Sequence, residues 1–153
     1  MKARYYFLML ALSLFAFAGC EKEKQQAVDL SVTVAGEWHC TPEAYDADIY
    51  VAFGTDGVFH LYQRVGEGRY RHYDGNWFVE KDVLRGVYSD GEEWGCTYKI
   101  AFDGDNLMVL TAMNENAETM TYVREVIPAD VRNESIAPFA AQRSSCDEQS
   151  RWL

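Results

Sequence analysis

The sequence predicts an all-β protein, an up-and-down antiparallel barrel of eight strands. Three observations support this fold class. The 153 residues include 10 Tyr, 8 Phe and 4 Trp, and aromatic side chains favour sheets over helices. Turn-forming residues recur at short, regular intervals between residues 35 and 125. The runs between these turns have no helical period, and closing eight such strands into a barrel removes the exposed edges of the sheet.

Eight strand-like runs are expected in order along the chain. They are GEWHC (36–40), DIYVAF (48–53), VFHLYQR (58–64), RYRHYDGNWFV (69–79), VLRGVYS (83–89), CTYKIAF (96–102), LMVLTAM (107–113) and TMTYVRE (119–125). Turn signals such as Gly-Thr-Asp-Gly at 54–57 separate them, and Pro128 ends the series. The barrel is therefore expected over residues 34–128, followed over 129–153 by a polar tail with one short helical turn.

The first 19 residues have the pattern of a secretion signal. Lys2 and Arg4 precede an apolar stretch that is shorter than the roughly 20 residues needed to cross a bilayer. Small residues then stand directly before Cys20, an ending that resembles a bacterial lipobox. We expect lipid on Cys20, a flexible tether over residues 20–33 and membrane attachment outside the cytoplasm. An ordinary signal peptide, with Cys20 used elsewhere, is the alternative.

The charge balance excludes one class of partner. Loss of the leader removes two of the 14 basic side chains and none of the 24 acidic ones, so the mature net charge is about −12. A surface of this charge repels nucleic acid and anionic lipid headgroups. We therefore expect no nucleic-acid partner, and membrane contact through the lipid anchor alone.

A short motif at the start of the first strand resembles that of a known family. Gly36-Glu37-Trp38 matches the Gly-x-Trp motif that opens lipocalin barrels, and Arg124 stands where that family has an arginine over the tryptophan. Over about residues 34–128 the chain is similar to lipocalin-like lipoproteins of Gram-negative bacteria. The resemblance implies a lipocalin-like (calycin-type) barrel, closed at its base by Gly36, Trp38 and Arg124, and anchored at the outer membrane. Which face of that membrane it occupies stays open.

Alternation along the strands assigns one face to the barrel interior. The inward set that would surround a small apolar or aromatic ligand is Phe53, Phe59, Leu61, Trp77, Tyr98 and Ile100. The alternative is a core filled by these side chains, because eight-strand barrels are at the size limit for holding a ligand.

The opposite face carries three tyrosines. If the turn at 54–57 is tight and the next turn centres on Gly66, Tyr50, Tyr62 and Tyr70 form a row across three strands, with His60 beside His72. Such a row could hold a sugar or a protein partner, or could be ordinary cross-strand packing. Two histidines are too few for a metal site, so no metal is expected.

Three cysteines remain once Cys20 is lipidated. An oxidising compartment favours one disulfide, and we rank Cys40–Cys96 first because both share the inward parity; a bridge from Cys146 to the barrel is the alternative.

No arrangement of residues indicates catalysis. The histidines and the serines of the tail form no recognisable triad, and no phosphate-binding loop is present in the sequence. We expect no enzyme activity and no cofactor. The leading hypothesis is an outer-membrane, lipid-anchored binding protein for a small apolar or aromatic ligand. The alternative is an interaction or structural lipoprotein, such as an inhibitor or complex subunit, that uses the barrel as a scaffold for a protein partner.

Overall fold

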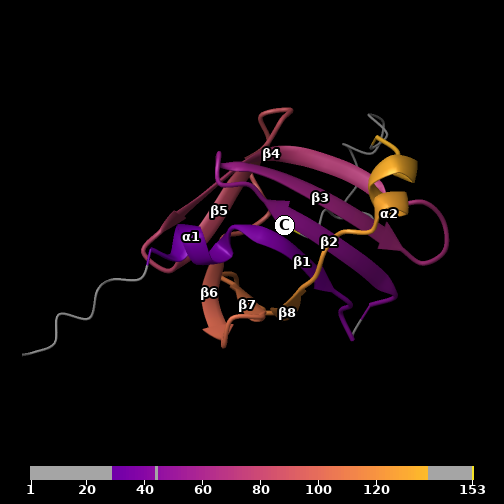
Figure 1. The fold of residues 1–153 in the computed structure, drawn as a ribbon. Coiled ribbons are helices and arrows are strands. Elements are labelled where there is room, and N and C mark those ends of the chain that lie inside the picture. Colours follow the sequence, from indigo (N-terminus) through magenta and orange to yellow (C-terminus); the bar gives the residue numbers. More distant parts are fainter. Residues whose placement is uncertain (1–28, 44, 138–152) are drawn as a thin grey trace, which may run out of the picture.

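The computed structural model describes residues 29–43, 45–137 and 153, and shows a closed barrel of eight antiparallel strands (Figure 1). Each strand pairs with the next, and the last pairs with the first. The strands are β1 (Gly36–Cys40), β2 (Ala47–Phe53), β3 (Val58–Val65), β4 (Arg71–Glu80), β5 (Val83–Tyr88), β6 (Tyr98–Asp103), β7 (Leu107–Ala112) and β8 (Thr119–Arg124). The predicted fold class and all eight strands are confirmed, with small differences at their ends.

Two short helices flank the barrel. Helix α1 (Leu30–Val34) begins after Asp29, whose carboxylate accepts a hydrogen bond from the Ser31 amide at 3.1 Å. The prediction of a flexible tether through residue 33 is therefore wrong for its last four residues. Helix α2 (Ala129–Glu134) follows Pro128 and confirms the short helical turn expected in the tail.

The two ends of the barrel differ. The base is the end with α1 and the turns at 54–57, 81–82 and 104–106; the mouth is the end with the loops 41–46, 66–70, 89–97 and 113–118. Val34 of α1 is fully buried in the core, so this helix covers the base. At the mouth, the loop 89–97 contributes Trp94 to the core.

Two of the eight strand junctions are short. Strands β2 and β3 pair over seven residues, whereas β1 and β8 pair only at Trp38–Arg124 and His39–Val123. Strands β5 and β6 also pair at only two positions, Val83–Lys99 and Leu84–Tyr98. We call these two junctions the short seams.

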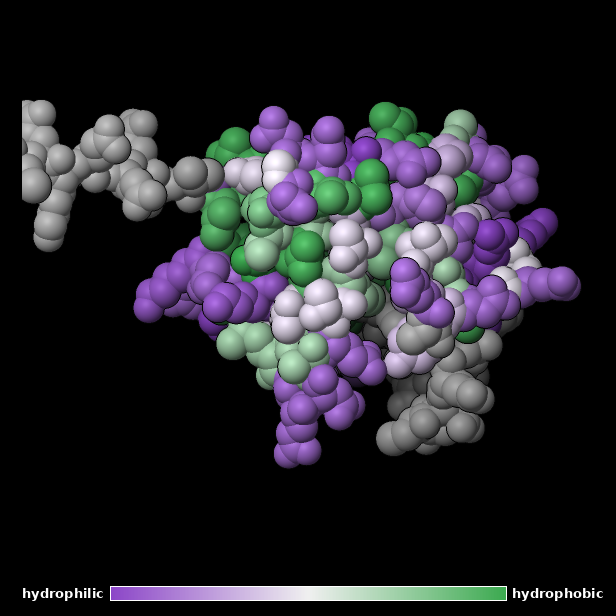
Figure 2. All heavy atoms as spheres, turned by 90° about the horizontal axis from the view of Figure 1, so that it is seen from below, coloured by the Kyte–Doolittle hydropathy of each residue, from purple (hydrophilic) through white to green (hydrophobic). Residues whose placement is uncertain are grey.

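The described residues form two apolar clusters. The larger fills the barrel, and the smaller lies outside it, where Ile127 and Val131 cover Tyr50 and Tyr62. Hydrophilic side chains cover most of the face seen in Figure 2, with apolar side chains in patches between them. Every strand finds both neighbours within residues 36–124, so the backbone pairing of the barrel uses none of the first 28 residues. None of the described helices is long and apolar enough to span a membrane.

Candidate functional site

The base is closed by the motif that the sequence analysis singled out. The Arg124 guanidinium lies 4.2 Å from the Trp38 ring centroid and donates hydrogen bonds to the carbonyls of Thr33 (3.0 Å) and Ala35 (3.2 Å). Trp38 Nε1 donates to the Val34 carbonyl at 2.8 Å. Gly36 has φ of +143°, and a Cβ there would come within 2.3 Å of Arg124 Nη1. A glycine is therefore required at position 36, because any side chain there would displace the arginine.

The six residues predicted to surround an interior ligand all lie in the barrel core. Their exposed fractions are 6% or less, and they belong to one continuous cluster: Phe53, Phe59, Leu61, Trp77, Tyr98 and Ile100. Their inward orientation is confirmed. In this conformation the described interior is occupied by side chains, as the filled-core alternative expects.

The sequence analysis missed two residues that help to fill this interior. Trp94, in the β5–β6 loop, packs between Phe53, Phe59 and Tyr98 at ring-centroid distances of 5.1–6.4 Å. Leu153 lies in the same cluster and is 1% exposed. Two features of the sequence could have indicated that Trp94 is buried: it is a lone large aromatic residue in a polar loop, and β5 has a glycine, Gly86. In the structure, a Cβ at Gly86 would lie 2.4 Å from the Trp94 ring.

The row of outer tyrosines is not an exposed surface. Tyr50 and Tyr62 are 7% and 6% exposed because Ile127 and Val131 pack over them. Tyr70 lies at the edge of this cluster, with its ring centroid 6.0 Å from that of Tyr50. The proposed grip on a sugar or partner at Tyr50, Tyr62 and Tyr70 is therefore wrong, since the residues after β8 already occupy that face.

The predicted pairing register is correct for strands β2 and β3 and wrong for strands β3 and β4. Tyr50 pairs with Tyr62 as expected, but Tyr62 pairs with His72 rather than Tyr70. The Gly66 amide donates to the Asp46 carbonyl of another loop at 2.6 Å, so β3 and β4 are joined by a wide loop instead of a tight turn. His60 Nδ1 and His72 Nε2 lie 3.0 Å apart, and no group of three metal-ligating side chains occurs in the described residues.

A polar network on the outer face holds β1, β2, β3 and β8 together near the mouth. His39 contacts Asp48 at 2.7 Å and Glu125 at 2.9 Å, and its ring stacks on Tyr50 at 4.2 Å. Asp48 also accepts hydrogen bonds from Arg64, at 2.9 Å, and from the Tyr70 hydroxyl. Burial raises the pKa of Asp48, but the hydrogen bonds from Tyr70 and His39 and the charges of His39 and Arg64 outweigh it, so the pKa lies below its ordinary value of 3.8.

This network makes stability depend on pH. A carboxyl group whose pKa is lowered by folding stabilises the fold above its unfolded pKa, and this contribution is lost as pH falls through the folded pKa. Asp48→Asn is expected to lower the free energy of unfolding by about 1–2 kcal/mol at pH 7. The difference between variant and unaltered protein should shrink as the pH falls below 3.8. Urea unfolding at several pH values measures it, and a constant difference from pH 7 to pH 2 would contradict the assignment.

The predicted Cys40–Cys96 disulfide is not formed. Both are thiols in the structure, with β7 and β8 standing between β1 and the segment before β6 around the barrel. Cys96 hydrogen-bonds with the Tyr98 hydroxyl, and burial raises the pKa of the Cys40 thiol to about 11. The Cys40 thiol therefore stays protonated at neutral pH. Cys146 and Cys20 lie outside the described residues.

A pocket of about 510 Å³ lies at the mouth, where β1 and β8 diverge beyond their two paired residues. We call it the mouth pocket. One wall comes from the end of β1 and the loop after it, and the other from the start of β8. Its lining residues are Cys40, Thr41, Pro42, Glu43, Tyr45, Glu118, Thr119, Met120 and Thr121.

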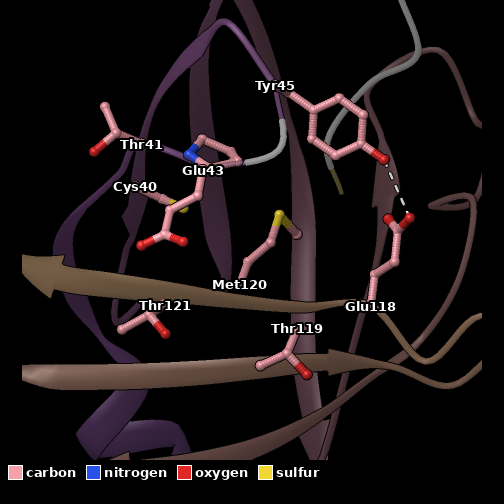
Figure 3. Close-up of a pocket in the computed structure, with 9 residues that line it drawn as sticks. Cys40, Thr41, Glu43, Tyr45, Glu118, Thr119, Met120 and Thr121 are labelled. Atoms are coloured by element: carbon pink, nitrogen blue, oxygen red, sulfur yellow. Dashed lines mark hydrogen bonds between the residues drawn. The ribbon is translucent and has the colours of Figure 1, made fainter.

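The side chains around the mouth pocket combine apolar groups with two carboxylates at the rim. Met120 projects from β8 toward Tyr45, while Glu43 overhangs the space between β1 and β8 (Figure 3). The Tyr45 hydroxyl donates to Glu118 at 3.1 Å and so joins the two walls. Two carboxylates at the rim disfavour an anionic ligand, and the sulfur and aromatic groups suit an apolar or aromatic one. None of the six predicted interior residues lines this pocket.

No family model and no curated protein matches the chain. Among solved structures, an uncharacterized protein from Bacteroides eggerthii DSM 20697 is similar with a TM-score of 0.44 and 15% sequence identity. The match covers 60% of this chain and 99% of that one.

Proposed function

We propose that this chain is a lipid-anchored binding protein of the bacterial outer membrane that holds a small apolar or aromatic ligand in the mouth pocket. The observation that supports the proposal is the pocket itself. Its volume of about 510 Å³ falls in the range of roughly 300–1,000 Å³ typical of small-molecule sites. It is also concave, partly apolar and lined by β1 and β8 of the closed barrel.

The pocket chemistry narrows the ligand class. Glu43 and Glu118 stand at the rim, and the mature chain carries a net charge of about −12. A negatively charged ligand would therefore be repelled during approach and at the site. A neutral or cationic molecule with one aromatic or branched apolar group fits the Met120 and Tyr45 side chains best.

Binding is tested with the neutral aromatic probe N-phenyl-1-naphthylamine and the chain from residue 27. We expect saturable fluorescence enhancement and a raised melting temperature, because a ligand that binds only the folded state stabilises it. Glu43→Trp should weaken binding at least tenfold, since its indole would fill the space that Glu43 overhangs. Fluorescence titration gives the dissociation constants.

The matched control is Glu67→Trp, which places the same side chain on another exposed mouth loop that does not line the pocket. This variant should bind the probe as the unaltered protein does. Equal binding by all three proteins, or no saturable binding by any, would contradict the proposal.

Anchoring is tested separately in the full chain. Cys20→Ala removes the expected site of lipid attachment, and two acyl chains are what give lasting attachment. We expect the unaltered protein in the membrane pellet and the variant in the soluble fraction after cell disruption and a salt wash, as measured by immunoblot. A variant that stays in the pellet would refute the lipoprotein assignment.

One observation favours a second candidate, a scaffold that binds a protein partner. Tyr45, Val65 and Met113 are 39–55% exposed, and all three stand at the mouth end of the barrel. Apolar side chains at a rim suit a partner surface as well as a ligand entrance. Native mass spectrometry of the protein purified from its host separates the two, because a bound small molecule supports the first function and a stoichiometric polypeptide the second.

A further inference from the structure

The backbone of β8 faces its two neighbouring strands in turn. The Arg124 amide bonds the carbonyl of Asn106, which precedes β7, at 2.9 Å, and the Glu125 amide bonds the Glu37 carbonyl of β1 at 3.0 Å. In an antiparallel sheet, successive residues direct their amide and carbonyl groups to opposite neighbours. Along β8, the even-numbered residues therefore face β7 and the odd-numbered residues face β1.

Two odd-numbered residues, Thr119 and Thr121, lie beyond the β1–β8 pairing. The two strands pair at only two positions nearer the base, and β1 is followed by Pro42, which has no amide hydrogen for a ladder. Both threonines line the mouth pocket instead, so this edge of β8 borders open space. The backbone of Thr121 hydrogen-bonds with the Cys40 thiol, which is a weak partner. A second strand with its own amide and carbonyl groups can complete this edge.

The side chains along the open edge alternate in character. Met120 points into the pocket and packs against the core cluster, whereas Thr119 and Thr121 are exposed. The ladder with β7 extends one residue before β8, because the Ala112 amide bonds the Glu118 carbonyl at 2.8 Å. Glu118 therefore shares the face of Met120, one step nearer the rim.

Charge favours a basic occupant of this edge. Glu43 overhangs the pocket, and Glu118 stands at its rim (Figure 3). Among the described residues, neither carboxylate forms an ion pair with a basic side chain. The mature chain also carries a net charge of about −12. A basic segment is therefore attracted both during approach and at the site.

We propose that the mouth pocket takes an extended peptide, which pairs antiparallel with β8 in the place that β1 leaves empty. An apolar peptide residue lies opposite Met120, and a basic residue two positions later lies opposite Glu118, because every second side chain shares a face. The peptide residue between them exchanges both backbone hydrogen bonds with Thr119. The partner is a polypeptide segment with the order apolar, any residue, basic. This inference rests on the mouth pocket of the proposed function.

The test compares three peptides by calorimetry with the full-length protein in a non-ionic detergent. In the parent, acetyl-Thr-Val-Thr-Lys-amide, the valine is placed opposite Met120 and the lysine opposite Glu118. N-methylation of the second threonine removes the donor that faces Thr119, and should weaken binding at least tenfold. N-methylation of the valine changes an amide that points away from β8. This matched peptide should bind within about twofold of the parent.

Each other result counts against the proposal. Equal affinities of the two methylated peptides would overturn strand pairing, since both keep the same side chains and charge. A loss confined to the methylated valine would overturn the antiparallel register. No saturable binding of the parent, up to the limit of its solubility, would overturn the peptide site itself.

The position of the basic residue is tested with Glu118→Gln, which keeps an oxygen for the Tyr45 hydroxyl. This variant should bind the parent peptide roughly threefold to fivefold more weakly, as expected for an exposed ion pair. It should bind a peptide with glutamine in place of lysine as the unaltered protein does. Glu115→Gln is the matched control, because it removes the same charge from the same loop and Glu115 does not line the pocket. Equal effects of the two substitutions would refute this placement.

The proposed function and the peptide site fail separately. Naphthylamine binding without peptide binding leaves the small-ligand site and removes the added strand. Peptide binding without naphthylamine binding leaves the added strand and removes the small ligand.

Discussion

Replacing Trp38 with alanine is expected to lower the free energy of unfolding by about 3–5 kcal/mol, the range for large aromatic residues removed from a core. The indole is fully buried and contacts Phe102 at a ring-centroid distance of 6.1 Å. Its loss also leaves the Val34 carbonyl without its 2.8 Å hydrogen bond and uncovers the base of the barrel beneath α1. Urea unfolding followed by circular dichroism measures the change.

The companion variant Arg124→Ala separates packing from the contact across the β1–β8 seam. Arg124 is exposed, so its loss should cost less, about 1–2 kcal/mol, through the cation–aromatic contact and the hydrogen bonds to Thr33 and Ala35. A double-mutant cycle with Trp38→Ala should give a coupling energy of about 0.5–1 kcal/mol. Strict additivity would refute the idea that the two residues act together.

Gly75→Ala is expected to destabilise the barrel by about 3 kcal/mol, the upper end of the usual range for overpacking. Gly75 is buried on β4, where an added Cβ would lie 2.1 Å from the Val87 carbonyl oxygen and 2.7 Å from the Tyr88 Cα. These are backbone atoms of the neighbouring strand, so they can yield only if β4 and β5 separate. Thermal unfolding should show a lower melting temperature with the same circular dichroism spectrum at 10 °C.

Gly95→Ala is the matched control for this variant. Gly95 is exposed, a Cβ there would meet no atom within 4 Å, and its φ is not in the left-handed region. The same substitution should leave the melting temperature within about 2 °C of the unaltered protein, since surface changes usually stay within ±0.5 kcal/mol. Equal effects of the two substitutions would show that the close approach at Gly75 does not govern stability.

Local patterns were sufficient to predict the strands and the faces of the strands. In residues 49–53 and 98–102, every second side chain faces the core as expected. This alternation depends only on which side of the sheet meets the core. The β2–β3 register was also predictable, because the turn at 54–57 is tight and the Gly54 amide bonds the Val58 carbonyl at 2.7 Å.

The β3–β4 register was not predictable because it depends on a contact distant in sequence. The Gly66 amide is bonded to Asp46 in another loop, which widens the turn and shifts the pairing by two residues. A shift of two keeps each side chain on its face, so the assignment of Tyr62 to the outer face is unaffected. Ile127 and Val131 cover that face. They belong to a segment that is polar overall, so the sequence did not indicate that it packs on the barrel.

The mouth pocket could not be found from the sequence for a related reason. Inward parity identified the core but not the side chains that fill it from outside the strands, Trp94 and Leu153. The mouth pocket arises from the divergence of β1 and β8, which is a property of barrel closure and leaves no pattern in either strand alone. Glu43 and Glu118 therefore looked like ordinary loop carboxylates.

The two short seams determine where the barrel wall is most easily opened. They lie at β1–β8 and β5–β6 and divide the hydrogen-bonded wall into a leaf of five strands, β1 to β5, and a leaf of three, β6 to β8. Each leaf is joined internally by five or more residue pairs per junction, whereas each short seam has two. Separating the two leaves therefore breaks fewer backbone pairs than opening the barrel at any other two of its junctions.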